Sequence, residues 1–378
     1  MKVAFVSFDC GQYCIRLANA LAREAEVFLL LPDQLAAPHV SKLDQRLKFQ
    51  FFNKPRLRQP FQQIQLVYGI LQQIRSFDPD VIHFQHGHLW FNLGLPLLRR
   101  YPLVITIHDP RHHVGDRYAQ KTPQMIMDFG YHRADQVIVH GEQQQHLVID
   151  QLHIPSEIVH VIPPVPDIVL DGVVDQHQIP EDGHLILFFG RIWEYKGLEY
   201  LIRAEPLITA QVPDAKILIA GKGEDFAHYR RMMVHPDHFI VYNEYIPDVR
   251  IAELFGRASL VVLPYIEASI SGVIPVAYTF GKPVVATAVG ILPEMVDHGR
   301  TGYVVRPRDE RALADAIVRL LRDKELRRQL GMNGKRMVNT KFSPDEVAQL
   351  TLTVYRRAIS CDRSRRSEAE GTPHSIER

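Results

Sequence analysis

The sequence predicts an α/β protein made of two doubly wound halves, each a parallel sheet covered by helices. Short apolar runs alternate with amphipathic stretches along the chain, which is typical of repeated βαβ units. This alternation is interrupted once, where Pro163, Pro164 and Pro166 precede a polar stretch at 171–183 without a clear period. It resumes at His184. The chain is therefore expected to hold two domains of roughly 160 residues each, with a linker between them.

The first half contains six apolar runs of strand length. Gly11 follows the first run, and the apolar residues after it recur at helical spacing. Asp80 and Asp135 stand in turn positions just before two of the runs. The expected strands cover residues 3–8, 26–31, 80–84, 103–107, 136–139 and 158–162.

The second half repeats this pattern and ends in helices. The expected strands cover 185–189, 215–220, 239–241, 260–263, 283–286 and 303–305. One helix is expected to begin at residue 196, and three more are expected at 310–322, 324–340 and 343–359. Ser343 is a candidate N-cap for the last helix. The chain after Cys361 is polar with mixed charges, so we expect disorder there. The predicted division is a first domain at 1–165, a linker at 166–183, a second domain at 184–342, a final helix at 343–360 and a tail at 361–378.

Composition excludes several classes of protein. The chain has 44 Lys and Arg against 43 Asp and Glu, and a formal net charge of +1, which argues against a nucleic-acid binder. Three cysteines do not form a disulfide framework in 378 residues, which favours a cytoplasmic location. Asp9 interrupts the first apolar run, so no export signal is expected. The stretch 271–292 has one charge, Lys282, but its prolines and glycines predict a soluble core segment rather than a membrane span.

The strongest local signal is FFGRIWEYKG at residues 188–197. Gly190 follows a buried strand, and Arg191 and Lys196 flank the start of the next helix. Two cations at the carboxyl end of a strand, next to a helix N-terminus, suit a diphosphate. The alternative is a pair of solvated surface cations.

A second signal is LPYIEASISGVIPVAYTFGKPVVAT at residues 263–287. Glu267 lies in a loop after a buried strand, and Ser271, Gly272 and Val273 open the next helix with backbone N–H groups suited to an anion. Further glycine turns are GKGED at 221–225, with Gly221 and Gly223, and the segment 290–305. Each is weak alone, because glycines occur in the turns of every α/β fold.

In this order, these segments resemble the second domain of a GT-B glycosyltransferase of glycosyltransferase family 4. The family's F-x-G-R-x-x-x-x-K-G is matched at 188–197, G-x-G at 221–223, P-V-V-A-T at 283–287 and E-x-V-x-x-G-x-x-G at 294–302. In the first half, DVIHFQ at 80–85, TIHD at 106–109 and ADQVIV at 134–139 are similar to family segments. The resemblance covers about residues 1–345.

The resemblance implies two Rossmann-like domains that face each other across a cleft, with the final helix crossing back onto the first domain. It implies retaining transfer of a sugar from a nucleotide diphosphate sugar, such as a UDP- or GDP-sugar, to a glycan or lipid-linked acceptor. This is the chemistry of polysaccharide or glycoconjugate biosynthesis. It also implies that no metal or other cofactor is bound.

The resemblance also implies roles for named residues. Arg191 and Lys196 hold the diphosphate and stabilise the leaving group, Glu267 contacts the donor sugar, and His108 faces the reacting sugar. Gly11 allows close approach of the first βα loop to the donor. The expected donor-binding set is completed by Gly190, Gly221, Gly223, Ser271, Gly272 and Val273.

One departure leaves other functions open. The family's signature contains two glutamates, of which the first is best matched here by Glu267. Val276 stands at the position of the second glutamate, which usually contacts the ribose of the nucleotide, so that contact must come from elsewhere or be absent. The alternatives are a non-catalytic GT-B partner protein with a degraded donor site, and a GT-B sugar phosphorylase or nucleotide-sugar epimerase. The nucleotide base, the sugar, the acceptor and the oligomeric state are not defined by the sequence.

Other clusters have plain explanations. The histidine-rich loops (His83, His86 and His88; His108, Asp109, His112, His113 and Asp116) match no zinc spacing and are expected to line a cleft or polar loops. Cys10 and Cys14 are expected to be small core residues. The first βα turn lacks G-x-G-x-x-G, which argues against a nicotinamide dehydrogenase.

The segment 42–58 has six basic residues against one acid, with interleaved phenylalanines. We expect either contact with an anionic membrane or lipid-diphosphate acceptor, or a strand with a solvated turn.

Overall fold

The computed structural model describes residues 1–85, 87–111, 122–166 and 180–370, and the chain divides into two compact units. Unit 1 contains Met1–Arg111, a segment that ends at Val165, and the chain from Pro344 onward. Unit 2 contains Pro166–Ser343. The divisions fall after Val165 and after Ser343.

Unit 1 is a parallel sheet of seven strands in the order β3-β2-β1-β4-β5-β6-β7. One apolar core lies on each face of this sheet. The strands are β1 (Lys2–Ser7), β2 (Glu26–Pro32), β3 (Lys48–Phe52), β4 (Val81–Gln85), β5 (Leu103–Thr106), β6 (Gln136–Val139) and β7 (Val159–Val161). The helices include α1 (Gly11–Leu21), α2 (Asp33–Ala36), α3 (Pro60–Phe77), α4 (Leu89–Gly94), α5 (Gln124–Tyr131) and α6 (Glu142–Leu152).

Strand β3 lies in the basic segment 42–58. It is the edge strand, paired only with β2, and its alternate positions Lys48 and Gln50 are exposed. This edge strand has no continuous apolar run, so it was not among the strands expected from periodicity, although a strand was one of the two alternatives for the segment. Lys48 pairs with Glu26 (2.6 Å) and Lys54 with Asp9 (2.9 Å). The structure therefore shows the strand that was one of the two expected alternatives.

Unit 2 is a parallel sheet of six strands in the order β10-β9-β8-β11-β12-β13. The strands are β8 (Leu185–Phe189), β9 (Lys216–Ala220), β10 (Phe239–Tyr242), β11 (Leu260–Leu263), β12 (Val284–Thr287) and β13 (Gly302–Val305). The helices are α7 (Leu198–Thr209), α8 (Ala227–Met232), α9 (Asp248–Arg257), α10 (Val273–Thr279), α11 (Leu292–Met295), α12 (Glu310–Arg322) and α13 (Lys324–Asn339). Helix α7 begins two residues later than expected, because Gly197 adopts a left-handed conformation (φ 63°).

Both sheets reverse their strand order at one point. In unit 1 the reversal lies between β1 and β4, and in unit 2 between β8 and β11. Loops from adjacent strands diverge there, which leaves a crevice beyond the carboxyl ends of the strands where ligands of α/β proteins bind. The segments that the sequence singled out follow β8 and β11 in unit 2, and β1, β4 and β5 in unit 1.

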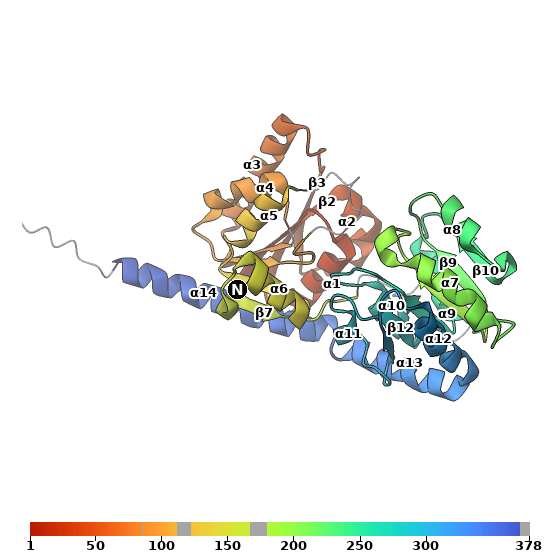
Figure 1. Ribbon diagram of the computed structural model, residues 1–378. Helices are drawn as coiled ribbons and strands as arrows, with labels where there is room; N and C mark the ends of the chain where they lie inside the picture. The colour runs from red at the N-terminus through yellow and green to blue at the C-terminus, as the bar shows by residue number, and fades with distance from the viewer. Residues whose placement is uncertain (86, 112–121, 167–179, 371–378) are drawn as a thin grey trace, which may run out of the picture. The chain divides into compact units, whose positions relative to one another are not determined.

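The last helix, α14 (Pro344–Glu370), belongs to unit 1 and packs against α1 (Figure 1). Val347, Leu352 and Tyr355 are buried in the core that α1 also lines. The helix continues ten residues beyond its predicted end, so the prediction of a disordered tail is wrong for 361–370. That segment is polar but has no proline or glycine to end the helix. Residues 371–378 lie outside the described residues.

Among the described residues, no helix has the combination of length and hydropathy that a membrane crossing requires.

Candidate functional site

The loop after β8 carries the two cations that the sequence predicts to bind a diphosphate. Arg191 is exposed and donates from Nη2 to the Tyr195 hydroxyl at 3.1 Å. In the part of the chain that the structure describes, Arg191 forms no ion pair with a carboxylate. Its positive charge is therefore held in place without being neutralised by an acidic side chain.

Lys196 lies against aromatic rings. Its Nζ is 3.7 Å from the centroid of the Tyr265 ring and 5.0 Å from that of Tyr195. An ammonium group over an aromatic face is stabilised by the ring quadrupole. Burial raises the pKa of the Tyr265 phenol, so this ring stays neutral at physiological pH. Tyr195 and Tyr265 belong to the site, although the sequence analysis did not name them.

The loops after β8 and β11 are bonded to each other. The backbone N–H groups of Ile266 and Glu267 both donate to the Tyr195 carbonyl, at 2.9 and 3.3 Å. Gly197 permits this close approach, because a Cβ there would lie 2.0 Å from the carbonyl oxygen of Pro264. The structure thus brings Lys196 and Glu267 into one neighbourhood.

The loops after β8 and β9 also meet backbone to backbone. A Cβ on Gly221 would lie 1.9 Å from the Gly190 carbonyl oxygen, and one on Gly223 would lie 1.9 Å from that of Ile192. Gly190 and Gly221 have φ values of 124° and 149°. These glycines shape the crevice by letting adjacent loops touch, which side chains would prevent.

The start of α10 faces this neighbourhood. The Val273 Cγ2 atom is the nearest neighbour of a Cβ built on Gly190, at 3.9 Å. Gly272 is the N-cap, and the Ser271 hydroxyl accepts from the Val273 N–H at 3.3 Å. Part of the predicted set of backbone donors is therefore already engaged by Ser271.

Val276 occupies the position where the family has its second glutamate. It is 2% exposed and packs in the apolar core of unit 2 with Ile274 and Ala277. The side chain that replaces the expected second glutamate therefore contributes to the core and offers no hydrogen bond to a ligand.

In unit 1, Gly11 is the first residue of α1, close behind β1. Gly11 is buried, and a Cβ on it would lie 2.8 Å from the Leu35 Cβ. Its lack of a side chain serves packing against α2. Its neighbour Cys10 is exposed and has the left-handed conformation (φ 56°), so the prediction that Cys10 is a core residue is wrong, whereas Cys14 is buried. The core assignment failed because Cys10 is the N-cap that precedes α1 and so does not share a helix face with Cys14.

His108 follows β5 and is 8% exposed. Its Nε2 is 2.7 Å from the Gln85 Oε1, and its Nδ1 is 3.1 Å from the Nε2 of His140. The Gln144 amide donates to its carbonyl oxygen at 2.8 Å. Since both ring nitrogens have protein partners, a contact between the imidazole and a sugar requires exchange of one of these bonds.

The proton positions in this array are linked. The Nδ1 of His140 faces the Ile162 carbonyl oxygen at 2.9 Å and must carry the proton. Burial lowers the pKa of His140 to about 4, so its Nε2 accepts and His108 Nδ1 donates. Then either His108 is protonated on both nitrogens, or the Gln85 amide is reversed and donates to Nε2. The charge of His108 and the orientation of Gln85 are therefore coupled.

The array continues to α14. His83 is fully buried, with Nε2 2.7 Å from the Thr106 hydroxyl and Nδ1 2.6 Å from the Tyr355 hydroxyl. Burial lowers the pKa of His83 to about 3, so it is neutral at physiological pH. The DVIHFQ motif pointed to His83 and Gln85, but only the fold shows that they connect His108 to the last helix.

Within the described ranges, no group of three or more His, Cys, Asp or Glu side chains is placed to hold a metal ion. His86, His112, His113 and Asp116 lie outside the described residues. The sets in unit 1 (Gly11 and His108) and unit 2 (Gly190, Arg191, Lys196, Gly221, Gly223, Glu267, Ser271, Gly272 and Val273) each lie beyond the carboxyl edge of their own sheet.

Comparison with known proteins relates the chain to enzymes of one family. Residues 10–168 match the profile described as Glycosyltransferase Family 4, and residues 183–323 match that of Glycosyl transferases group 1. The chain is 33% identical to an uncharacterized glycosyltransferase of Methanocaldococcus jannaschii over 48% of this chain and 47% of that protein. It therefore spans about half the length of this relative. It is 27% identical to D-inositol 3-phosphate glycosyltransferase of Mycobacterium leprae over 79% of this chain and 75% of that protein.

Solved structures share the architecture. Sucrose-phosphate synthase of Thermosynechococcus elongatus superimposes with a TM-score of 0.74 at 20% identity, over 96% of this chain and 100% of that one. Anabaena HepE in complex with UDP gives 0.73 at 18% identity, over 94% and 100%. The two parallel sheets are the GT-B fold, as the sequence predicted. Together, the two matching profiles and this fold show that the chain belongs to glycosyltransferase family 4.

Proposed function

We propose that the chain is a retaining glycosyltransferase that moves a sugar from a nucleotide diphosphate sugar to a glycan or lipid-linked acceptor. The observation that carries this proposal is the placement of Arg191 and Lys196 at the carboxyl end of β8, where the strand order reverses. Departure of a nucleoside diphosphate develops negative charge, and two fixed cations in a crevice stabilise it.

The donor class is proposed on the same residues. Arg191 offers a planar set of N–H donors to phosphate oxygens, and Lys196 supplies a second charge. Glu267, on the facing loop, is proposed to accept hydrogen bonds from donor-sugar hydroxyls. Anabaena HepE, which shares the fold, is described in complex with UDP-glucose, and this favours testing uridine donors first.

The acceptor side is proposed to lie on unit 1. Phe61, Ile64 and Tyr68 recur on one side of α3 and are 86%, 55% and 61% exposed. The basic segment 42–58 precedes this helix. Exposed apolar side chains close to basic residues suit a lipid-linked acceptor or the surface of an anionic membrane. Replacing Phe61 and Tyr68 by serine is expected to abolish sedimentation with phosphatidylglycerol vesicles at low salt. Unchanged sedimentation, or no binding by the original protein, removes this part of the proposal.

The first experiment is a thermal-shift screen against UDP-, GDP-, ADP- and TDP-sugars, each compared with its bare nucleotide. A ligand that binds only the folded protein raises the melting temperature. We expect a shift with one nucleotide family, and its loss in Arg191→Ala. The accepted donor is then incubated with candidate acceptors, and NMR of the anomeric proton shows whether configuration is retained.

One observation favours a second function. Val276 is buried in the core and cannot replace the ribose contact of the expected glutamate. A non-catalytic protein with a degraded donor site is therefore the competing proposal. No thermal shift with any nucleotide sugar at millimolar concentration supports it. Release of sugar phosphate from a disaccharide, or epimerised donor without acceptor, instead indicates a phosphorylase or an epimerase.

A further inference from the structure

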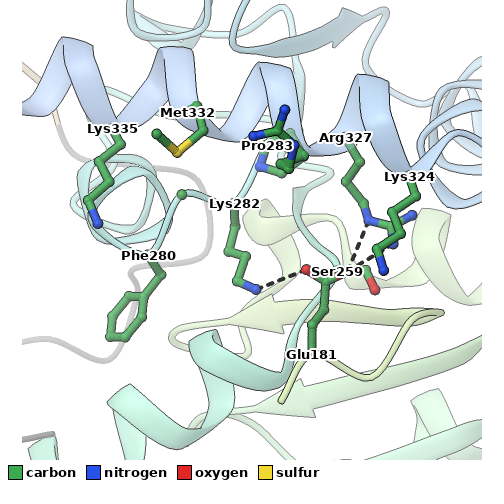
Figure 2. Close-up of a pocket in the computed structure, with 11 residues that line it drawn as sticks. Glu181, Ser259, Phe280, Lys282, Pro283, Lys324, Arg327, Met332 and Lys335 are labelled. Atoms are coloured by element: carbon green, nitrogen blue, oxygen red, sulfur yellow. Dashed lines mark hydrogen bonds and ion pairs between the residues drawn. The ribbon is translucent and has the colours of Figure 1, made fainter. Parts of the chain in front are cut away.

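A second concave site lies in unit 2, at the edge of the sheet opposite to Arg191 and Lys196. Its lining comes from the segments that precede β8, β11 and β12 and from α13 (Figure 2). The cavity has a volume of about 280 Å³. This is below the size of a typical drug-sized pocket, but it is large enough for several waters or a small organic anion.

The charge of this cavity is strongly unbalanced. Among the described residues, five cations line it, namely Lys282, Lys324, Arg327, Arg328 and Lys335, against one carboxylate, that of Glu181. The whole chain has a formal net charge of only +1, so this concentration is a local feature. Like charges gathered in a cavity repel one another unless an anion joins them.

Two of these cations are buried and share one acid. Arg327 is 4% exposed and Lys282 is 8% exposed. Glu181 accepts from Arg327 at 2.9 and 3.1 Å and from Lys282 at 3.3 Å (Figure 2). Arg327 also donates to the carbonyls of Leu320 and Leu321 at the end of α12, whose partial negative charge offsets part of the excess. The Glu181 carboxylate thus accepts from both buried cations. Its one negative charge does not balance their two positive charges.

Of the three remaining cations, Lys324 and Lys335 are available to a ligand. Arg328 pairs with Glu325 at the surface, at 2.7 Å. Across the described chain, neither Lys324 nor Lys335 has a carboxylate at ion-pair distance. Both project from α13, and their side chains point to the same side of that helix as Arg327 (Figure 2). Burial lowers the pKa of Lys282, and an anion in the cavity opposes that shift.

We propose that this cavity is a second ligand site, which binds a small phosphorylated metabolite through its phosphate group. A phosphate monoester carries close to two negative charges and three acceptor oxygens, which match a surplus of lysine and arginine donors. Phe280 and the 45% exposed Met332 border the cavity and offer apolar contact to the organic part of the ligand. The site is separate from the proposed donor site and does not depend on the proposed function.

The test uses the full chain with inorganic phosphate and glucose 6-phosphate as probes, titrated calorimetrically at constant ionic strength with chloride as the balancing anion. The variant Lys324→Gln with Lys335→Gln removes two rim charges without disturbing the buried Glu181 contacts. The matched control is Lys216→Gln with Lys341→Gln, which removes two charges from unit 2 outside the cavity. We expect binding to weaken about tenfold or more in the first variant and less than twofold in the control.

A third variant separates the two sites. Arg191→Ala with Lys196→Ala is expected to keep the response to both probes. If it loses the response while the Lys324 and Lys335 variant keeps it, phosphate occupies the donor site and the proposal is overturned. Absence of heat with both probes overturns it as well. Sedimentation with phosphatidic acid vesicles but no response to the soluble probes replaces the metabolite with a lipid headgroup, and so also overturns the proposal as stated.

Discussion

In the part of the chain that the structure describes, the Arg191 guanidinium is held by a phenol rather than by a carboxylate, unlike several arginines of unit 2. Arg203, Arg257 and Arg327 each pair with an acid. The charge of a paired cation is neutralised by the protein's own carboxylate. The charge of Arg191, which donates to the neutral Tyr195 hydroxyl, is not neutralised in this way and can attract an anionic ligand. The role proposed for Arg191 therefore depends both on its position after β8 and on its having no acidic partner among the described residues.

The first prediction is that Arg191→Ala lowers kcat about a hundredfold or more, because a group that stabilises developing charge acts mainly in the transition state. Steady-state kinetics with the donor identified in the thermal-shift screen measure this. Arg203→Ala, which removes an exposed arginine of the neighbouring helix α7, is the control and is expected to leave kcat unchanged. A kcat within twofold of the original for Arg191→Ala contradicts the assignment.

The second prediction concerns the buried histidines of unit 1. The pKa values of His83 and His140 are lowered to about 3 and about 4, against 6.5 for the unfolded side chain. The unfolded state thus binds more protons below pH 6.5, so stability is complete above that pH and falls as the pH drops towards 4. Between pH 7 and 5 each histidine is expected to cost about 2 kcal/mol of unfolding free energy.

Urea unfolding of unit 1 at pH 7 and 5, followed by hydrogen exchange of β4 and β6 peptides, measures this loss. His140→Gln is the informative variant, because it should reduce the pH dependence by one histidine's share whatever it does to stability at pH 7. Equal unfolding free energies at the two pH values contradict the neutral, buried state of both side chains.

At the scale of elements, two loops are shaped by contact between their backbones. Gly197 ends the turn Glu194–Lys196 with φ 63°, and its missing Cβ leaves room for the Pro264 carbonyl oxygen. The loop after β8 thereby reaches the loop after β11, and Lys196 comes to lie on the Tyr265 ring. A glycine that the family motif already contains is here the residue that sets the position of a proposed catalytic cation.

The third prediction follows from that contact. Gly197→Ala places a methyl group where the nearest atom is 2.0 Å away, so the two loops must separate and Lys196 must leave Tyr265. We expect a loss of about 1–3 kcal/mol in stability and a clear drop in donor binding. The control is Gly299→Ala, which also has positive φ (77°) but no heavy atom within 4 Å of the added Cβ. It is expected to lose about 1 kcal/mol and keep donor binding. Equal donor binding in both variants contradicts the proposed loop geometry.

At the scale of the whole molecule, the fold was largely predictable from periodicity, because buried parallel strands are continuous apolar runs. All six expected strands of unit 2 are present. The exceptions have physical causes. Strand β3 is a charged edge that has no such run, and the extension of α14 lacks any residue that ends a helix.

The candidate site was predictable only where a loop follows its strand directly. Arg191, Lys196 and Glu267 come to one edge because parallel strands of one sheet end together. The partners of His108 were not predictable, because Gln85, His140 and Tyr355 approach it or its neighbours from three separate elements. Spacing in the sequence carries no information on such contacts. The basic cavity had no motif either, since Glu181 and Arg327 are far apart in the chain.

The last prediction concerns how the end of the chain stabilises the beginning. Helix α14 follows unit 2 in sequence but places Leu352, which is 1% exposed, in the core of unit 1. Leu352→Ala is expected to cost unit 1 about 2–5 kcal/mol, through lost burial and the cavity left behind. Hydrogen exchange should rise in α1, which packs against α14, and stay unchanged in the strands of unit 2. Leu350→Ala, on the same helix but 38% exposed, is the matched control and should change little. Equal loss of protection in both units would contradict this prediction. It would mean that a defect in the core of unit 1 destabilises unit 2 as well, so that the two units unfold as one cooperative body.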